Sequence, residues 1–157
     1  MKKFGVILFI LLLVATGCAS NNNETKIEKK EGVINCTLDN TENGLTIKSN
    51  YEAKYKNGYV TNINSEEIIT SENSAALEAL EKQIVGMYSV YDDVVGYNYS
   101  TNLTGNTLTS KVDADYLVID TEEMLTITPA MSEYIKDGKI KIEDIKDVYI
   151  ALGAICN

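Results

Sequence analysis

The sequence predicts an α+β fold: an antiparallel β-sheet built from hairpins, with helices packed on one face. Residues 45–55 and 59–69 alternate apolar with polar side chains on either side of Asn57-Gly58, which is typical of two half-buried strands joined by a tight turn. Residues 74–91 and 142–152 instead repeat apolar side chains at helical spacing. A domain of this size most simply packs both helices on one face of a single sheet.

Residues 1–17 contain the parts of an export signal. Met1-Lys2-Lys3 supplies positive charge, residues 4–14 are almost entirely apolar, and Ala15-Thr16-Gly17 precedes Cys18. The apolar run is shorter than the ~20 residues that a membrane-spanning helix needs. Small residues directly before a cysteine are typical of a bacterial lipobox, so we expect cleavage before Cys18 and a lipid on its thiol. The alternative is an uncut N-terminal helix that happens to end in cysteine.

The lipid on Cys18 would hold the mature chain at the membrane. Two or three acyl chains anchor a protein firmly, at ~0.8 kcal/mol per buried CH₂. We expect localisation to the extracytoplasmic face of the cell membrane, with the membrane as a partner through the covalent lipid. Residue 19 is alanine and not the aspartate that is associated with retention in the inner membrane. In a host with two membranes, the outer membrane is therefore an alternative location. Residues 18–32 predict a polar, flexible tether, and residues 33–157 suit a single α+β lipoprotein domain.

The charge of the chain excludes some partners. The sequence has a formal net charge of −9, with 23 acidic residues, 14 basic residues that are all lysine, and no histidine. Such a balance argues against nucleic acid, because nucleic acid rewards basic patches. It equally disfavours adsorption to anionic lipid headgroups, so the lipid on Cys18 must provide the anchoring.

The remaining strands are predicted from shorter patterns. Residues 33–38 predict a short first strand, and residues 39–44, which end in Asn43-Gly44, predict a turn. Residues 97–103 and 107–119 predict a second hairpin across Gly105-Asn106.

The helices are predicted from their end signals. Residues 71–74 supply several N-cap candidates for the first helix. Gly86 costs that helix roughly 1 kcal/mol relative to Ala, so we expect it to end between Gly86 and Tyr91. Two further helices are predicted from a start and a stop: Pro129 to Ile135, and Ile142 to Leu152 with Gly153 as the stop.

Three cysteines are present. With Cys18 taken by the lipid, Cys36 and Cys156 remain, and an even pair in an exported domain favours a disulfide. The alternative interpretation is two buried free thiols.

The sequence lacks the common catalytic patterns. Histidine is absent, which removes the commonest acid–base and zinc designs, and no Gly-rich phosphate loop or Gly-x-Ser-x-Gly elbow occurs. Asp113, Asp115 and Glu123 lie along and after a predicted strand with no glycine turn, so a solvated acidic edge is favoured over calcium binding. A carboxylate pair for glycoside hydrolysis would lack tryptophan platforms. We therefore expect no enzyme activity, no metal and no cofactor.

The sequence contains ten tyrosines. Tyrosine has an apolar body and a polar tip, so it suits both sheet packing and recognition surfaces. Core packing is the plain interpretation, and a contact patch on the open face of the sheet is the alternative. We predict that Tyr51 and Tyr55 pack inside, whereas Tyr59, Tyr97 and Tyr99 contribute to an exposed contact surface.

The order of these features resembles the YehR family of bacterial lipoproteins, also known as DUF1307. The resemblance rests on the lipobox, the Asn-rich tether, Cys36-Thr37, the hairpin at Asn57-Gly58, the helix toward Tyr88, the segments 96–99 and 109–113, and the last helix before Cys156. It implies an α+β domain with helices packed on an antiparallel sheet, in which Cys36 and Cys156 correspond to the family's paired cysteines. It implies no activity, because the function of the family is uncharacterised. The turn at residues 39–43 is longer than the family pattern, and residues 124–134 are elaborated.

The leading functional hypothesis is a non-enzymatic, membrane-anchored module that binds a small ligand or an envelope protein. The anchor, the tether and the tyrosine-rich hairpins favour it. One alternative is a structural envelope accessory protein that acts in a complex. The other is an enzyme that uses carboxylates alone.

Overall fold

The computed structural model describes residues 30–157, so the predicted signal peptide, Cys18 and most of the predicted tether lie outside the described residues. The strands of the main sheet are β1 (Glu31–Glu42), β2 (Leu45–Lys56), β3 (Tyr59–Thr70), β4 (Tyr97–Thr104), β5 (Thr107–Asp115) and β8 (Ile155–Cys156). The other elements are α1 (Ser74–Tyr88), η1 (Ser89–Tyr91), α2 (Thr121–Ile127), η2 (Pro129–Glu133), β6 (Ile135–Lys136), β7 (Lys139–Ile140) and α3 (Ile142–Ala151).

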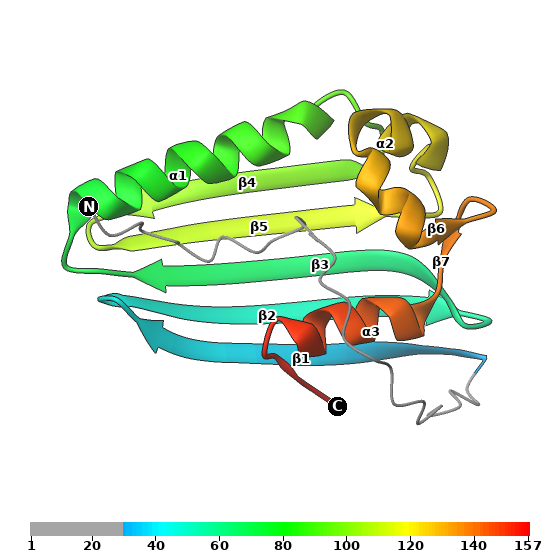
Figure 1. Ribbon diagram of the computed structural model, residues 1–157, viewed down its shortest axis with the longest axis horizontal. Helices are drawn as coiled ribbons and strands as arrows, with labels where there is room; N and C mark the ends of the chain where they lie inside the picture. The colour runs from blue at the N-terminus through cyan, green and yellow to red at the C-terminus, as the bar shows by residue number, and fades with distance from the viewer. Residues whose placement is uncertain (1–29) are drawn as a thin grey trace.

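The main sheet has six strands in the order β4-β5-β3-β2-β1-β8, and each neighbouring pair is antiparallel (Figure 1). Strands β1, β2 and β3 form a meander. The β4–β5 hairpin joins it through β5, and the short β8 pairs with the other side of β1. Strands β6 and β7 form a separate small hairpin. The fold is α+β, as the sequence predicted.

Both long helices cover the same face of the sheet. Residues paired across an antiparallel sheet point to the same face, and one such row crosses five strands: Cys36, Tyr51, Ser65, Val112 and Tyr99. Tyr149 of α3 stacks on Tyr51 with ring centroids 4.6 Å apart. Tyr88 of α1 packs on Tyr99 with centroids 5.7 Å apart. The row therefore lies on the helix-covered face, and no helix of residues 30–157 covers the opposite face, which we call the open face.

The packing of α1 follows from its spacing. Its buried side chains, Leu77, Leu80, Ile84 and Tyr88, recur every three or four residues and lie on one face of the helix. Burying each such side chain contributes about 1.5–3 kcal/mol. Asn73 is the N-cap, because its side chain accepts a hydrogen bond from the Ala76 amide at 3.1 Å. The helix ends at Tyr88, inside the predicted interval.

The hairpin at Asn57-Gly58 is confirmed. Asn57 has φ 54° and Gly58 φ 81°, and a tight hairpin turn favours Asn-Gly because both residues accept positive φ. The first strand is longer than predicted, because Asn43-Gly44 forms a second turn of the same kind with φ 53° and 79°. Residues 39–42 therefore continue β1 and pair with residues 45–48 instead of forming a turn.

The segment between β5 and α3 differs most from the prediction. The strand predicted to reach residue 119 ends at Asp115, because the chain turns there. Residues 121–127 form α2, which the sequence analysis missed, and the Asp120 side chain caps it through the Glu122 amide at 2.9 Å. Pro129 begins a helix as predicted, but the helix is a 3₁₀ turn that ends at Glu133.

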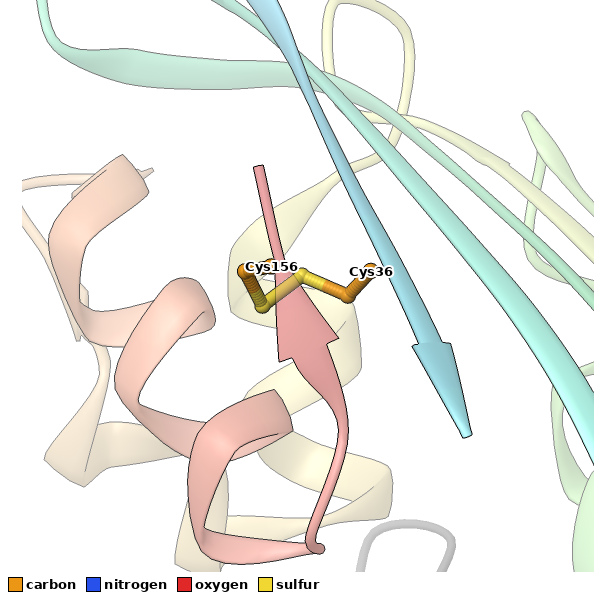
Figure 2. The surroundings of a disulfide bond; sticks show 2 residues. All are labelled: Cys36 and Cys156. Carbon is orange, nitrogen blue, oxygen red and sulfur yellow. A yellow bond between two sulfur atoms is a disulfide. The ribbon is translucent and has the colours of Figure 1, made fainter. Parts of the chain in front are cut away.

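The C-terminal segment closes the sheet edge. Helix α3 runs from Ile142 to Ala151, so it ends one residue before the predicted Leu152. Gly153, the predicted stop, has φ 92°. The chain then reverses so that Cys156 pairs with Cys36 in the β1–β8 register. The two residues form a disulfide, with Cα atoms 4.0 Å apart and a sequence separation of 120 (Figure 2). This is the pairing that the sequence favoured.

Candidate binding surface

Two of the three predicted contact tyrosines lie on the covered side of the sheet. Tyr97 is 7% exposed and packs against Tyr91 with ring centroids 4.8 Å apart. Tyr99 is half-buried and lies against Tyr88. The prediction of an exposed surface formed by Tyr59, Tyr97 and Tyr99 is therefore wrong. Alternation placed Tyr97 and Tyr99 on a common face, but the position of α1 decides which face that is.

The third residue, Tyr59, is 38% exposed at the start of β3. The Lys139 ammonium lies 5.2 Å from the centroid of its ring. The other half of the tyrosine prediction is confirmed, because Tyr51 and Tyr55 are 5% and 6% exposed. Core packing, the plain interpretation of the tyrosines, therefore accounts for four of these five residues, because only Tyr59 is exposed.

One buried carboxylate lies among the tyrosines of the covered face. Glu67 is 5% exposed, and its carboxylate accepts hydrogen bonds from the Tyr51 hydroxyl at 2.9 Å and from the Ser49 hydroxyl at 3.3 Å. Burial raises the pKa of this carboxyl above its usual value, and the two hydrogen bonds oppose that shift. Both of its partners, Tyr51 and Ser49, are themselves buried, so Glu67 is part of the core.

The open face carries two rows of polar side chains across five strands. The first row, read from β1 to β4, is Asn35, Glu52, Asn64, Asp113 and Asn98. The second row is Thr37, Asn50, Glu66, Lys111 and Ser100. We call these residues the polar rows. They flank the covered row on either side, and the pleat turns them to the opposite face.

The polar rows line a shallow hollow of about 570 Å³. Its floor is the backbone of the strand residues between the two rows, whose side chains point toward the helices. The volume lies in the range of small-molecule sites, ~300–1,000 Å³, but most such sites have apolar walls. Carbon atoms make up the larger part of the surface of this hollow too, but its lining side chains also carry amide, hydroxyl and charged groups, so it can recognise a ligand by hydrogen bonds.

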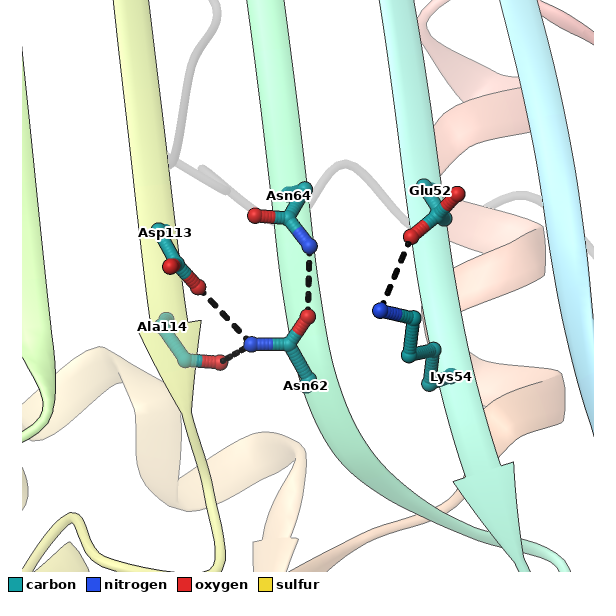
Figure 3. Close-up of polar contacts among 6 residues, drawn as sticks. All are labelled: Glu52, Lys54, Asn62, Asn64, Asp113 and Ala114. Carbon is teal, nitrogen blue, oxygen red and sulfur yellow. Dashed lines mark hydrogen bonds and ion pairs between the residues drawn. The ribbon is translucent and has the colours of Figure 1, made fainter.

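A network of side-chain hydrogen bonds orders one end of the hollow (Figure 3). The Asn62 amide donates to Asp113 Oδ1 at 2.8 Å and to the Ala114 carbonyl at 3.2 Å. The Asn64 amide donates in turn to Asn62 Oδ1 at 2.5 Å. These bonds fix the orientation of two amides and one carboxylate before any ligand arrives, which lowers the entropy cost of binding.

Ion pairs offset part of the negative charge of the hollow. Lys111 Nζ lies 2.7 Å from Glu66 Oε1. Figure 3 shows the other pair, in which Lys54 Nζ lies 3.4 Å from Glu52 Oε1. The exposed amides of Asn35, Asn50 and Asn98 make no side-chain hydrogen bond to another described residue and are available to a ligand. An amide offers both a donor and an acceptor, so these side chains suit a neutral polar ligand.

The predicted carboxylate candidates separate in the structure. Asp113 bonds to Asn62, and Asp115 Oδ1 accepts the Leu117 amide at 3.0 Å. Within residues 30–157, no group of three or more acidic or cysteine side chains is arranged to hold a metal ion. In the same part of the chain, no helix combines the length and the apolar composition that a membrane crossing requires.

The polar rows were not predicted from the sequence. The alternation of each strand identified outward positions, but only the register shows that Asn98, Asn64 and Asn35 lie in one line. The available signal was compositional: asparagine is depleted in strands, yet it recurs at outward positions in several of these strands.

Comparison with solved structures supports the fold. The chain is similar to the NMR structure of the Escherichia coli YehR protein, with a TM-score of 0.54 and 18% identity over 82% of this chain and 93% of that one. It is also similar to the NMR structure of a protein from Streptococcus pneumoniae TIGR4, with a TM-score of 0.50 and 13% identity over 93% of this chain and 94% of that one. No family model and no curated protein matches the sequence. The fold is thus YehR-like.

Proposed function

We propose that this protein is a lipid-anchored lipoprotein of the extracytoplasmic membrane face whose domain binds a polar ligand or an envelope protein in the hollow of the open sheet face. The polar rows carry the proposal, because an antiparallel sheet with one covered face leaves the other free for recognition. The signal-like residues 1–17 and Cys18 support the anchor.

We also propose membership of the YehR (DUF1307) family. The support is the order of sequence features, from the residues before Cys18 to the paired Cys36 and Cys156, together with the YehR-like fold. Membership fits the proposed binding role and adds no activity.

The proposed role is binding without catalysis. Three carboxylates line the hollow, and each already has a partner: Glu52 with Lys54, Glu66 with Lys111, and Asp113 with Asn62. Glu67, whose pKa is raised by burial, lies on the other face of the sheet. A general acid or base must reach the proton that it transfers, and Glu67 does not face the hollow.

The anchor is tested by metabolic labelling with a fatty acid. The full-length chain should incorporate the label and sediment with membranes, and Cys18→Ala should lose both properties. Label retained in Cys18→Ala would overturn the anchor.

The binding surface is tested by crosslinking in the producing cells. A photoreactive amino acid at Asn50 or Asn98 should give a discrete adduct. The same amino acid at Asn102, which is exposed on the same face but outside the hollow, is the matched control. Adducts from all three positions, or from none, would contradict a site in the hollow.

Mass analysis of the discrete adduct identifies what was bound. The variant Asn50→Ala, introduced beside the photoreactive position at Asn98, should then reduce the adduct yield. Asn102→Ala in the same background should leave the yield unchanged.

A further inference from the structure

The two ends of the sheet differ in composition. One end, which we call the tether end, is defined by Lys30, Gly58, Gly96 and Asp115. Backbone hydrogen bonds hold these points together, from the Asn57 amide to the Lys30 carbonyl and from the Asp115 amide to the Gly96 carbonyl at 2.8 Å. The opposite end, which we call the hairpin end, contains the turns at Gly44 and Asn106, which bond to Ser71.

Exposed apolar side chains gather at the tether end. Four of the nine large hydrophobic residues that are exposed in the described chain lie there: Tyr59, Val95, Leu117 and Val118, at 38%, 70%, 77% and 54% exposure. Val118 lies against Gly96, the residue that follows Val95, because a Cβ built on Gly96 would lie 3.2 Å from the Val118 Cβ. Leu117 is the most exposed large hydrophobic residue of the described chain.

Lysines surround the apolar side chains on the β1–β2 side of the tether end. Five exposed lysines occur there: Lys30, Lys54, Lys56, Lys139 and Lys141. Lys56 and Lys141 pair with Tyr59 through the backbone, and Lys139 lies over its ring. Acidic residues occur here too, with Glu31 opposite Lys56 and Asp115 beside Leu117. Glu52 pairs with Lys54, and the exposed Asp93, Asp120 and Asp137 lie two residues from Val95, Val118 and Lys139 along the chain. Lysines and acidic residues are thus present in similar numbers at the tether end, and the lysines are grouped around Gly58.

We propose that the tether end is a membrane-contacting surface, with Val95, Leu117 and Val118 entering the interface of the bilayer and the lysines around Gly58 meeting its phosphates. The inference rests on the proposed lipid anchor. Only residues 19–29 separate Cys18 from Lys30, and an extended chain covers at most ~3.5 Å per residue, so Lys30 stays within roughly 40 Å of the anchored cysteine. Exposed apolar side chains, with a tyrosine and lysines at the same end of the domain, are typical of interfacial contacts.

This contact would orient the domain. Strand β1 has 12 residues, and at ~3.3 Å per residue its far end lies roughly 40 Å from the tether end. The polar rows lie on the open face, between the two ends of the sheet. The hollow would therefore stay accessible to solvent while the tether end contacts lipid.

The test uses the absence of tryptophan from the sequence. The lipidated full-length protein is reconstituted in vesicles of phosphatidylethanolamine and phosphatidylglycerol whose acyl chains are brominated. Leu117→Trp should show blue-shifted emission and strong quenching by the bromines. The matched control, Asn106→Trp at the hairpin end, should show neither. Both positions are exposed turns, so both variants should fold.

A second comparison tests the lysines. The double variant Lys56→Glu with Lys139→Glu should reduce the quenching of Leu117→Trp, whereas Lys82→Glu on the exposed side of α1 should not. Equal quenching at positions 117 and 106 in protein that floats with the vesicles would overturn the contact and leave the anchor standing. Protein that carries no lipid and does not float would overturn the anchor and the contact together.

Discussion

The covered and open faces of the sheet use the same five strands in opposite ways. On the covered face, the residues between the polar rows pack against two helices and include stacked tyrosines and a disulfide. On the open face, their immediate neighbours form exposed amides and ion pairs. Since successive residues of a strand alternate faces, one stretch of chain carries both a core and a candidate binding surface. Substitutions separated by one position should therefore have very different effects.

The largest expected effect is alkaline unfolding of the covered face. Burial raises the pKa of Tyr51, Tyr88, Tyr97 and Tyr149 well above the usual value of 10.0. Above that value the unfolded chain releases protons that the folded chain keeps, so the free energy of unfolding falls by up to ~1.4 kcal/mol per tyrosine and pH unit. We expect circular dichroism and tyrosinate absorbance to change together above about pH 10. Complete tyrosine ionisation with unchanged circular dichroism would contradict the buried cluster.

Truncation of one core tyrosine should come next. Tyr88 is 1% exposed and contacts the rings of both Tyr97 and Tyr99. Tyr88→Ala should lower the free energy of unfolding by about 3–5 kcal/mol, as for other large buried aromatic side chains. Asn98→Ala, between the two ring partners on the open face, should change it by less than about 0.5 kcal/mol. Urea unfolding of both variants measures this free energy. Similar losses in the two variants would contradict the different roles of the two faces.

The disulfide should contribute somewhat less. Cys36 is 1% exposed on the covered face and joins Cys156 at the sheet edge. Replacing both by alanine should cost about 2–4 kcal/mol, because the unfolded chain loses a constraint. The melting temperature should fall equally on reduction of the wild-type protein, whereas the double variant should ignore the reductant. Free alkylation of both thiols in natively produced, unreduced protein would refute the pairing.

Glu67 should make the free energy of unfolding depend on pH in the acid range, with a smaller effect than those above. Burial raises its folded-state pKa above the usual value of 4.5. The stability associated with the protonated form is therefore complete below the unfolded pKa and is lost as the pH rises through the folded pKa. The wild type should lose stability relative to Glu67→Gln over this interval, measured as the difference in urea midpoint. A difference that stays constant from acid to neutral pH would show that Glu67 is not buried as described.

The smallest effect should come from the open face. The Lys111–Glu66 pair spans 2.7 Å, but its side chains are 59% and 38% exposed. Exposed pairs contribute about 0–1 kcal/mol, so Lys111→Ala should scarcely shift the urea midpoint. The same variant should nevertheless reduce the crosslinking yield from Asn98. A large stability loss with unchanged crosslinking would reverse the roles of the two faces.

The fold was predictable where local chemistry decides it. The Asn57-Gly58 turn, the cap region before Ser74 and the stop at Gly153 all depend on residues close in sequence. The full extent of β1 is not evident from the sequence, because the polar residues before Asn43-Gly44 are themselves typical of a turn, whereas they continue a paired strand. The short helix α2 was missed because seven residues give too little periodicity to recognise.

The candidate site was less predictable, because it depends on how distant strands align. Alternation showed that Tyr97 and Tyr99 share a face, yet only their packing against Tyr88 identifies that face as covered. Asn35 and Asn98 lie on strands at opposite sides of the hollow, and four strand pairings align them. Such alignment depends on register, which a single sequence does not display.

The link between Cys36 and Cys156 also determines how the domain would respond to force. A pull on the chain before Glu31 would peel β1 from β2 one residue at a time. That peeling would reach Cys36 after residues 31–35, where the disulfide connects β1 to the strand that follows α3. Tension would then divide between β1 and β8 instead of running along a single strand. The disulfide would thus stop a force applied to the chain before Glu31, on the side of Cys18, from separating β1 from β2 residue by residue.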